Sequence, residues 1–169
     1  MSNQGLFVEE HRVLPEWIDI NGHMNVAYYV LAFDICVDAL WERIGITDEY
    51  VEKRQLSTFA VESHVTYQAE LKLDDPFRIV TQLLAVDEKR LHQYQCMYHA
   101  EQGYLAATAE WLNVHVNLRT RRVTPFPPEI LQAFVDVASE QERIEIAPEV
   151  GRRMRVEKPL FSLPGYADD

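Results

Sequence analysis

Residues 16–44, EWIDINGHMNVAYYVLAFDICVDALWERI, join a tight polar turn to a long apolar segment, and this junction decides the fold. Over residues 26–44 the apolar positions recur three or four residues apart, which is the spacing of a helix. Most of the other positions in this segment are apolar too, which indicates a helix buried on nearly all sides. The run is too short, and too often interrupted by carboxylates, to span a bilayer. We therefore expect one long buried helix.

The turn before this helix carries a polar side chain at every second position. Asp19, Asn21, His23 and Asn25 alternate there, and Gly22 gives the backbone the freedom to bend. The N–H groups that begin a helix have no intrahelical acceptors and lie at the positive end of the helix dipole. Such N–H groups beside a carboxylate, an amide and an imidazole suit chemistry in which a carbonyl oxygen gains negative charge.

Composition limits the class of protein. The chain has 169 residues, 47% of them hydrophobic, which fits one globular domain with a core of ordinary size. Its net charge of -11 argues against a nucleic-acid binder but leaves room for a small anionic ligand held by local basic residues. Cys36 and Cys96 lie in apolar patterns, so we expect no disulfide framework and a reducing compartment. The N-terminus has no signal-like segment, so we expect a cytoplasmic protein without membrane contact.

The rest of the chain predicts strands joined by short turns. Residues 58–70 alternate with period two, which places Phe59, Val61, Val65 and Tyr67 on one face, and Glu62 and His64 on the other. The strands are expected at residues 6–14, 58–70, 77–86, 91–100 and 104–118, with a polar connection before the second and a short helix at 129–138.

These elements predict an α+β fold in which a curved antiparallel five-stranded sheet wraps around one helix. Strands joined by short turns pair antiparallel, and the open edges of the sheet would be covered by a second copy of the chain. We therefore expect a homodimer or a dimer of dimers. Residues 1–141 would form the domain, and residues 142–169 a tail packed on the surface or on a partner subunit.

The motif DxNGHMNxxxY, at residues 19–29, resembles the hotdog-fold thioesterases of the 4-hydroxybenzoyl-CoA thioesterase-like superfamily. The likeness continues through VESHVTYQAEL (61–71) and DEKRLH (87–92). It implies a hotdog fold and hydrolysis of an acyl-CoA thioester without a metal or redox cofactor. Bacterial members place a catalytic carboxylate three residues before a glycine, and plant members use a DxNxH run. Both patterns fall on Asp19, the second also on Asn21 and His23.

The resemblance also implies substrate contacts. The polarising N–H at the helix start falls near Val26, and Tyr29 lies one turn further on. In some members a second carboxylate faces the site across the dimer, and by this resemblance Glu62 and His64 would contact the substrate. The alternative is that both residues simply lie on a solvated strand face. The candidates for coenzyme A phosphates are basic residues at strand ends: Lys89, Arg90 and Arg121.

Three interpretations of function stay open at this point. The leading one is an acyl-CoA thioesterase with Asp19 as nucleophile or general base, acting on a small or medium acyl group. A similarity to thioesterase modules fused to carnitine dehydrogenase points to betainyl-CoA, whose trimethylammonium group suits aromatic residues and net negative charge. The alternative is a non-catalytic acyl-CoA-binding or regulatory module, in which Asp19 only caps its turn. A hotdog dehydratase ranks last.

Overall fold

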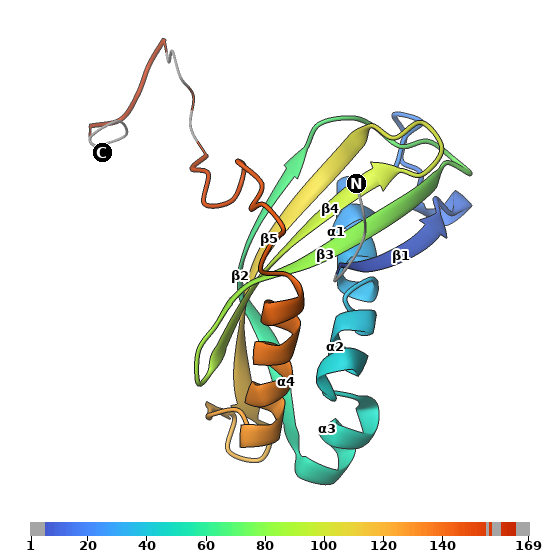
Figure 1. Cartoon of the computed structure of the whole chain (residues 1–169). Helices are drawn as coiled ribbons and strands as arrows, with labels where there is room; N and C mark the ends of the chain where they lie inside the picture. The colour runs from blue at the N-terminus through green and yellow to red at the C-terminus, as the bar shows by residue number, and fades with distance from the viewer. Residues whose placement is uncertain (1–5, 155, 157–159, 165–169) are drawn as a thin grey trace.

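A computed structural model describes residues 6–154, 156 and 160–164. Five long strands form one antiparallel sheet in the order β1-β3-β4-β5-β2, and a short strand, β6, pairs with β5. Figure 1 shows the strong twist of this sheet and the helices packed against it. The strands are β1 (Phe7–Arg12), β2 (Leu56–Tyr67), β3 (Pro76–Val86), β4 (Arg90–His99), β5 (Leu105–Asn117) and β6 (Arg122–Val123).

The helices are α1 (Val26–Ile35), α2 (Asp38–Ile44), α3 (Asp48–Arg54) and α4 (Pro128–Glu140), with a 3-10 turn, η1, at Pro15–Trp17. Helix α1 packs against one half of the sheet, while α2, α3 and α4 cover the other half (Figure 1). The expected curved sheet with a central helix and a C-terminal helix is therefore confirmed. The positions of the sheet strands are also those expected, to within a few residues.

The central helix differs from the expectation in two ways. It is divided, because Cys36 and Val37 form a turn between α1 and α2. It is also buried on one face only. Tyr29, Ala32 and Phe33 face the core, whereas the apolar side chains of Val26, Val30, Leu31 and Ile35 are 36–55% exposed in the single chain. Because nearly every position of this helix is apolar, the sequence could not show whether its own sheet covers all of the helix or leaves one face exposed.

The expected polar connection before β2 is a helix instead. Thr47 caps α3 by accepting a hydrogen bond from the Tyr50 N–H, and acidic residues in the first turn and basic residues in the last complement the helix dipole. Tyr50 is buried, and its hydroxyl lies 2.9 Å from Nε2 of His115 on β5. The start signal was present in the sequence, but only burial of Tyr50 made this short charged segment a stable helix.

A β-bulge in β2 corrects the predicted faces of that strand. The register with β5 shifts between Ala60 and Glu62, so Val61 is the additional residue. Because one extra residue reverses the alternation, Phe59 lies on the face of Glu62 and His64, opposite Val65 and Tyr67. The polar face of the strand thus begins at Glu62, and the side of β2 that looks toward α1 carries Thr58, Ala60, Ser63, Val65 and Tyr67.

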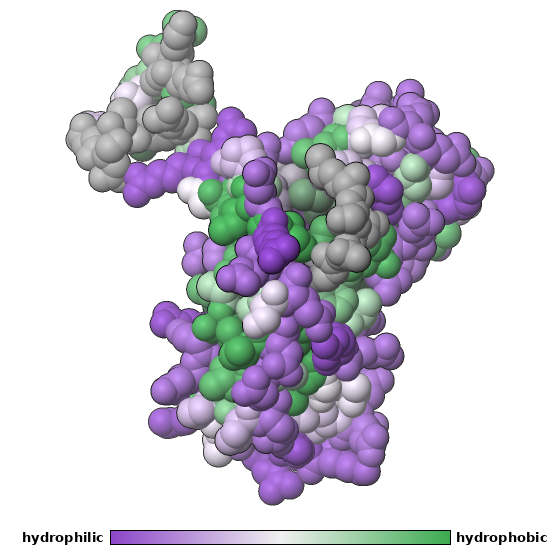
Figure 2. Space-filling model, in the orientation of Figure 1, coloured by the Kyte–Doolittle hydropathy of each residue, from purple (hydrophilic) through white to green (hydrophobic). Residues whose placement is uncertain are grey.

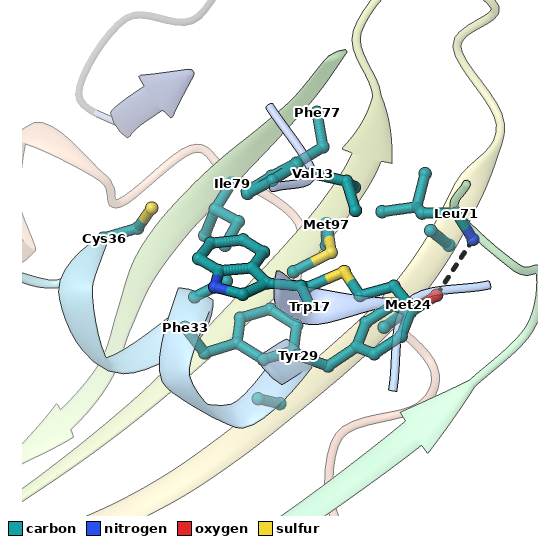
Figure 3. Packing of buried hydrophobic residues seen from close by; sticks show 14 residues of the cluster. Val13, Trp17, Met24, Tyr29, Phe33, Cys36, Leu71, Phe77, Ile79 and Met97 are labelled. Atoms are coloured by element: carbon teal, nitrogen blue, oxygen red, sulfur yellow. Dashed lines mark hydrogen bonds between the residues drawn. The ribbon is translucent and has the colours of Figure 1, made fainter. Parts of the chain in front are cut away.

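Two apolar clusters hold the layers together. The first joins α1 and η1 to the sheet, with Trp17, Phe33 and Phe77 fully or almost fully buried (Figure 3). Within it the Tyr29 hydroxyl accepts a hydrogen bond from the Leu71 N–H at 3.0 Å, drawn as the dashed line in Figure 3. The second cluster packs α2 and α4 on the sheet around Leu40 and Phe134. The start of α1 is therefore fixed to both η1 and the segment that follows β2.

The segment after α4 crosses to the outer face of the sheet. The side chain of Gln141 accepts a hydrogen bond from the Leu83 N–H at 2.9 Å, and Gln82 donates to the Ile144 carbonyl at 3.4 Å. Further on, the Gly151 N–H donates to Glu110 at 2.8 Å. In Figure 2 hydrophobic residues gather near the middle of this side of the molecule, and hydrophilic residues dominate both ends. Residues 155, 157–159 and 165–169 of the expected tail lie outside the described residues.

Candidate functional site

The DxNGH turn forms a closed loop directly in front of α1. Ile18 and Met24 form a β-bridge, and the Asp19 N–H donates to the His23 carbonyl at 3.1 Å. Gly22 has φ +78°, a conformation that L side chains rarely adopt, and its N–H donates to the Asp19 carbonyl at 3.0 Å. The loop therefore holds Asp19 and His23 side by side at its base.

The Asp19 carboxylate is engaged within this loop. One oxygen accepts from the Asn21 N–H at 2.7 Å, and the other lies 3.4 Å from the Asn21 side-chain amide. His23 Nδ1 donates to the Met24 carbonyl at 3.2 Å, so Nε2 is the ring nitrogen left for another partner. Asp19 is half-buried and does not line the hollow at the start of α1, whereas His23 does. In the single chain Asp19 and Asn21 thus stabilise a turn, and their catalytic role stays a prediction.

The first turn of α1 has one backbone donor available. The Asn25 side chain caps the helix by accepting from the Ala27 N–H at 3.0 Å, and its carbonyl accepts from the Tyr28 N–H at 2.9 Å. The Val26 N–H has no acceptor among the described residues. This amide therefore combines an unused hydrogen with the positive end of the helix dipole.

A hollow of about 310 Å³ opens beside this amide. Its walls include His23, Val26, Tyr29 and Tyr67, and the two tyrosine rings meet edge to face with centroids 5.3 Å apart. Burial raises the pKa of Tyr29, and its hydroxyl is occupied by the Leu71 N–H, so Tyr29 is a neutral, fixed wall. The hollow thus lies at the start of α1, where Val26 is one of its walls.

Glu62 and His64 lie elsewhere, on the outer face of the sheet. They line a second hollow, of about 450 Å³, together with His92 and Glu110. His92 Nε2 lies 2.8 Å from Glu110, whose other oxygen accepts from the Gly151 N–H. The single chain therefore does not bring Glu62 and His64 to the start of α1, and their role in substrate binding stays a prediction.

The three basic candidates lie at turns on the opposite half of the sheet. Arg90 pairs with Asp87 in the β3–β4 turn at 2.6 Å, and the neighbouring Lys89 donates its N–H to the same carboxylate. The Arg121 guanidinium stacks over the Phe59 ring, 5.0 Å from its centroid. None of the three lines the hollow at Val26. Their contact with coenzyme A phosphates stays a prediction.

A third cavity, of about 100 Å³, was missed by the sequence reasoning. It lies between the helices and the sheet, where Phe33, Asp34 and Trp41 face Gln93, Gln95 and Trp111. Gln93 and Gln95 are almost fully buried, yet a side-chain oxygen of each has no hydrogen-bond partner among the described residues. The available signal was a pair of glutamines at positions of β4 that share a face with the buried Leu91 and Met97.

Comparisons with known proteins place this chain in a family. The family model described as "Thioesterase-like superfamily" matches residues 13–134. A Pseudomonas aeruginosa protein named betainyl-CoA thioesterase is 38% identical over 89% of this chain and 94% of its own length. An L-carnitine dehydrogenase/betainyl-CoA thioesterase of Rhizobium meliloti is 32% identical over 85% of this chain, which spans only 29% of that longer protein.

A solved structure has a similar fold. A hypothetical protein of Staphylococcus aureus, solved in complex with CoA, superposes with a TM-score of 0.85 at 29% identity, covering 90% of this chain and 96% of that one. Within the described residues, no helix combines the length and apolar character needed to cross a bilayer.

Proposed function

Because this chain belongs to the thioesterase-like superfamily and is a thioesterase, we propose that it hydrolyses a small acyl-CoA to the free acid and coenzyme A at the start of α1. The observation that carries this location is the Val26 N–H, which has no acceptor among the described residues and belongs to a residue that lines a hollow of about 310 Å³. A thioester carbonyl there would receive a hydrogen bond that strengthens as its oxygen becomes an oxyanion.

Asp19 is the proposed catalytic carboxylate. As a nucleophile it would attack the carbonyl carbon, the C–S bond would break, and coenzyme A would leave as the thiolate; water would then hydrolyse the acyl anhydride. As a general base it would instead take a proton from the attacking water. His23, next to it at the base of the loop, would orient the water through Nε2. A thiolate is a good leaving group, so the reaction needs no metal or redox cofactor.

The acyl group we propose is betainyl, a trimethylammonium group one methylene from the thioester carbonyl. Two similar proteins carry betainyl-CoA thioesterase in their names, one of them 38% identical over nearly its whole length. The net charge of -11 favours a cationic acyl group over an anionic one.

We further propose that the enzyme is a homodimer built on β2 and α1. Strand β2 ends the sheet order, so its outer edge offers backbone groups for pairing. The first turn of α1 lies beside this strand, as the contact between Tyr29 and Tyr67 shows, and α1 leaves an apolar side exposed. A second copy related by a two-fold axis would pair the β2 edges and cover both helices. Light scattering on the eluting protein should therefore give twice the chain mass.

An interface variant tests this assembly. Val30→Asp places a charge in the exposed apolar side of α1 and should produce monomers with little activity. The matched control is Val135→Asp, which puts the same charge on an exposed position of α4. A monomeric wild-type protein, or a Val30→Asp variant that stays dimeric, would contradict the proposed interface.

A panel of acyl-CoA substrates with a thiol-reactive dye tests the activity. We expect betainyl-CoA to be cleaved faster than acetyl-, benzoyl- and longer fatty acyl-CoAs. Asp19→Asn retains a side-chain oxygen that can accept from the Asn21 N–H, whereas Asp19→Ala does not. If Asp19 is catalytic, both variants lose turnover. If it only stabilises the loop, Asp19→Asn keeps turnover and only Asp19→Ala is impaired.

A further inference from the structure

We propose that the cavity of about 100 Å³ between α1, α2 and the sheet is the acyl pocket, and that Asp34, Trp41 and Trp111 bind the quaternary ammonium group of the substrate. The inference rests on the proposed function, because it names the residues that select the acyl group. Aromatic rings around a carboxylate are the surroundings that quaternary ammonium ions favour, since the ring faces and the carboxylate are both negative.

The cavity walls also carry buried polar side chains. Gln93 and Gln95 are only 3% and 1% exposed, and the unpartnered oxygen of each belongs to a residue that lines this space. The indole N–H of Trp111 and the side-chain nitrogen of Asn113, which also line this space, likewise have no hydrogen-bond partner among the described residues. Buried polar atoms almost always have partners in native proteins, so this group of donors and acceptors marks the cavity as a polar site. The Gln95 amide nitrogen is held by the Phe33 carbonyl at 2.9 Å, which fixes its orientation.

Asp34 gives an independent reason for a cation. It is an exposed carboxylate placed among Val30, Leu31 and Ile35, the apolar side of α1 that a second copy would cover. None of the ion pairs in the described part of the chain includes Asp34. Covering an unpaired carboxylate costs several kcal/mol unless a cation compensates it. A bound quaternary ammonium would supply that charge inside the dimer.

The proposed dimer would also bring this pocket to the thioester. The exposed apolar positions of α1 run from Val26 to Ile35, so a two-fold axis through their middle places Val26 of one copy opposite Ile35 of the other. If the axis of the proposed dimer also passes through the middle of β2, Tyr67, a wall of the hollow, would lie opposite Leu56, two residues from Thr58 at the cavity. Both elements therefore bring the hollow of one copy beside the ammonium pocket of the other. Because the betainyl group is short, the pocket for its ammonium group must lie directly beside the thioester carbonyl.

The test compares betainyl-CoA with 3,3-dimethylbutyryl-CoA, a neutral analogue in which carbon replaces the quaternary nitrogen. The wild-type enzyme should favour the cation by about 10- to 30-fold in kcat/KM. Asp34→Asn should reduce kcat/KM for betainyl-CoA by about tenfold and leave the neutral analogue within about threefold. Trp41→Leu should likewise lower the preference for the cation. Asp38→Asn removes a nearby carboxylate that does not line the cavity, and should keep the preference.

Direct binding of tetramethylammonium, followed by tryptophan fluorescence and calorimetry, provides a readout independent of turnover. Wild type should bind it, and Asp34→Asn should bind it several-fold more weakly. If no acyl-CoA is hydrolysed the proposed function fails, and this titration still decides the pocket. The inference is overturned if the wild-type protein does not bind tetramethylammonium, which is the result expected for a cavity that holds only water. The inference is also overturned if Asp34→Asn lowers kcat/KM equally for betainyl-CoA and for its neutral analogue.

Discussion

Replacing Val26 with proline removes the backbone N–H from the site and exchanges one small apolar side chain for another. Proline lacks the backbone N–H, and it is favoured at the first position of a helix because its φ is already helical. Asn25, the residue before it, has φ -67° and ψ 143°, the extended conformation that a residue preceding proline adopts. The Val26 side chain is 55% exposed, so the ring meets little of the core. We expect V26P to fold with an unchanged Tm.

The expected loss of activity follows from the neighbouring donors. The Ala27 N–H is bound to the Asn25 side chain, and the Tyr28 N–H to the Asn25 carbonyl, so neither can replace the missing donor without breaking the helix cap. Losing a single oxyanion donor typically lowers kcat about 100- to 1000-fold, which is about 2.7–4 kcal/mol of transition-state stabilisation. KM should change much less, because the hydrogen bond strengthens mainly in the transition state.

The assay is steady-state hydrolysis followed by release of the coenzyme A thiol. Val26→Ala is the matched control, because it shortens the same side chain and keeps the N–H; its kcat should stay within about threefold of wild type. A V26P enzyme that folds normally and retains wild-type kcat would refute the placement of the thioester carbonyl at the start of α1.

Three further predictions concern the fold. Phe134→Ala should lower the free energy of unfolding by about 3–5 kcal/mol in a urea titration, because this ring is fully buried between α4 and the sheet; a change below about 1 kcal/mol would contradict that packing. Burial lowers the pKa of His115, so below the ordinary histidine pKa of about 6.5 the unfolded chain binds the proton more readily, and stability should fall as the pH drops through that value. His115→Gln should flatten this part of the Tm-against-pH curve; an equally steep curve would exclude His115 as its cause. Burial raises the pKa of the Cys36 thiol to about 12, so Cys36 should react with a thiol reagent at neutral pH only after unfolding, and rapid labelling of the native protein at this residue would contradict its burial.

The sequence by itself determined the local elements and the family. Period-two alternation, turn residues and the helical spacing after Asn25 predicted the strands and the central helix, because each signal depends on neighbours only a few positions away. The same local pattern placed Val26 at the helix start, where the structure leaves its N–H without an acceptor among the described residues. Motif spacing predicted the thioesterase family, which the family match confirms.

The tertiary structure decided which faces and distant residues meet. A single additional residue at Val61 reversed the faces of β2 and put Phe59 beside Glu62, an event that alternation cannot foresee. Burial of Tyr50 turned a charged connection into α3. The pocket around Asp34 takes its walls from α1, α2, β2, β4 and β5, so no spacing along the chain could bring it together. The periodicity of a sequence predicts which side chains share a face, whereas only tertiary packing decides which residues those side chains contact.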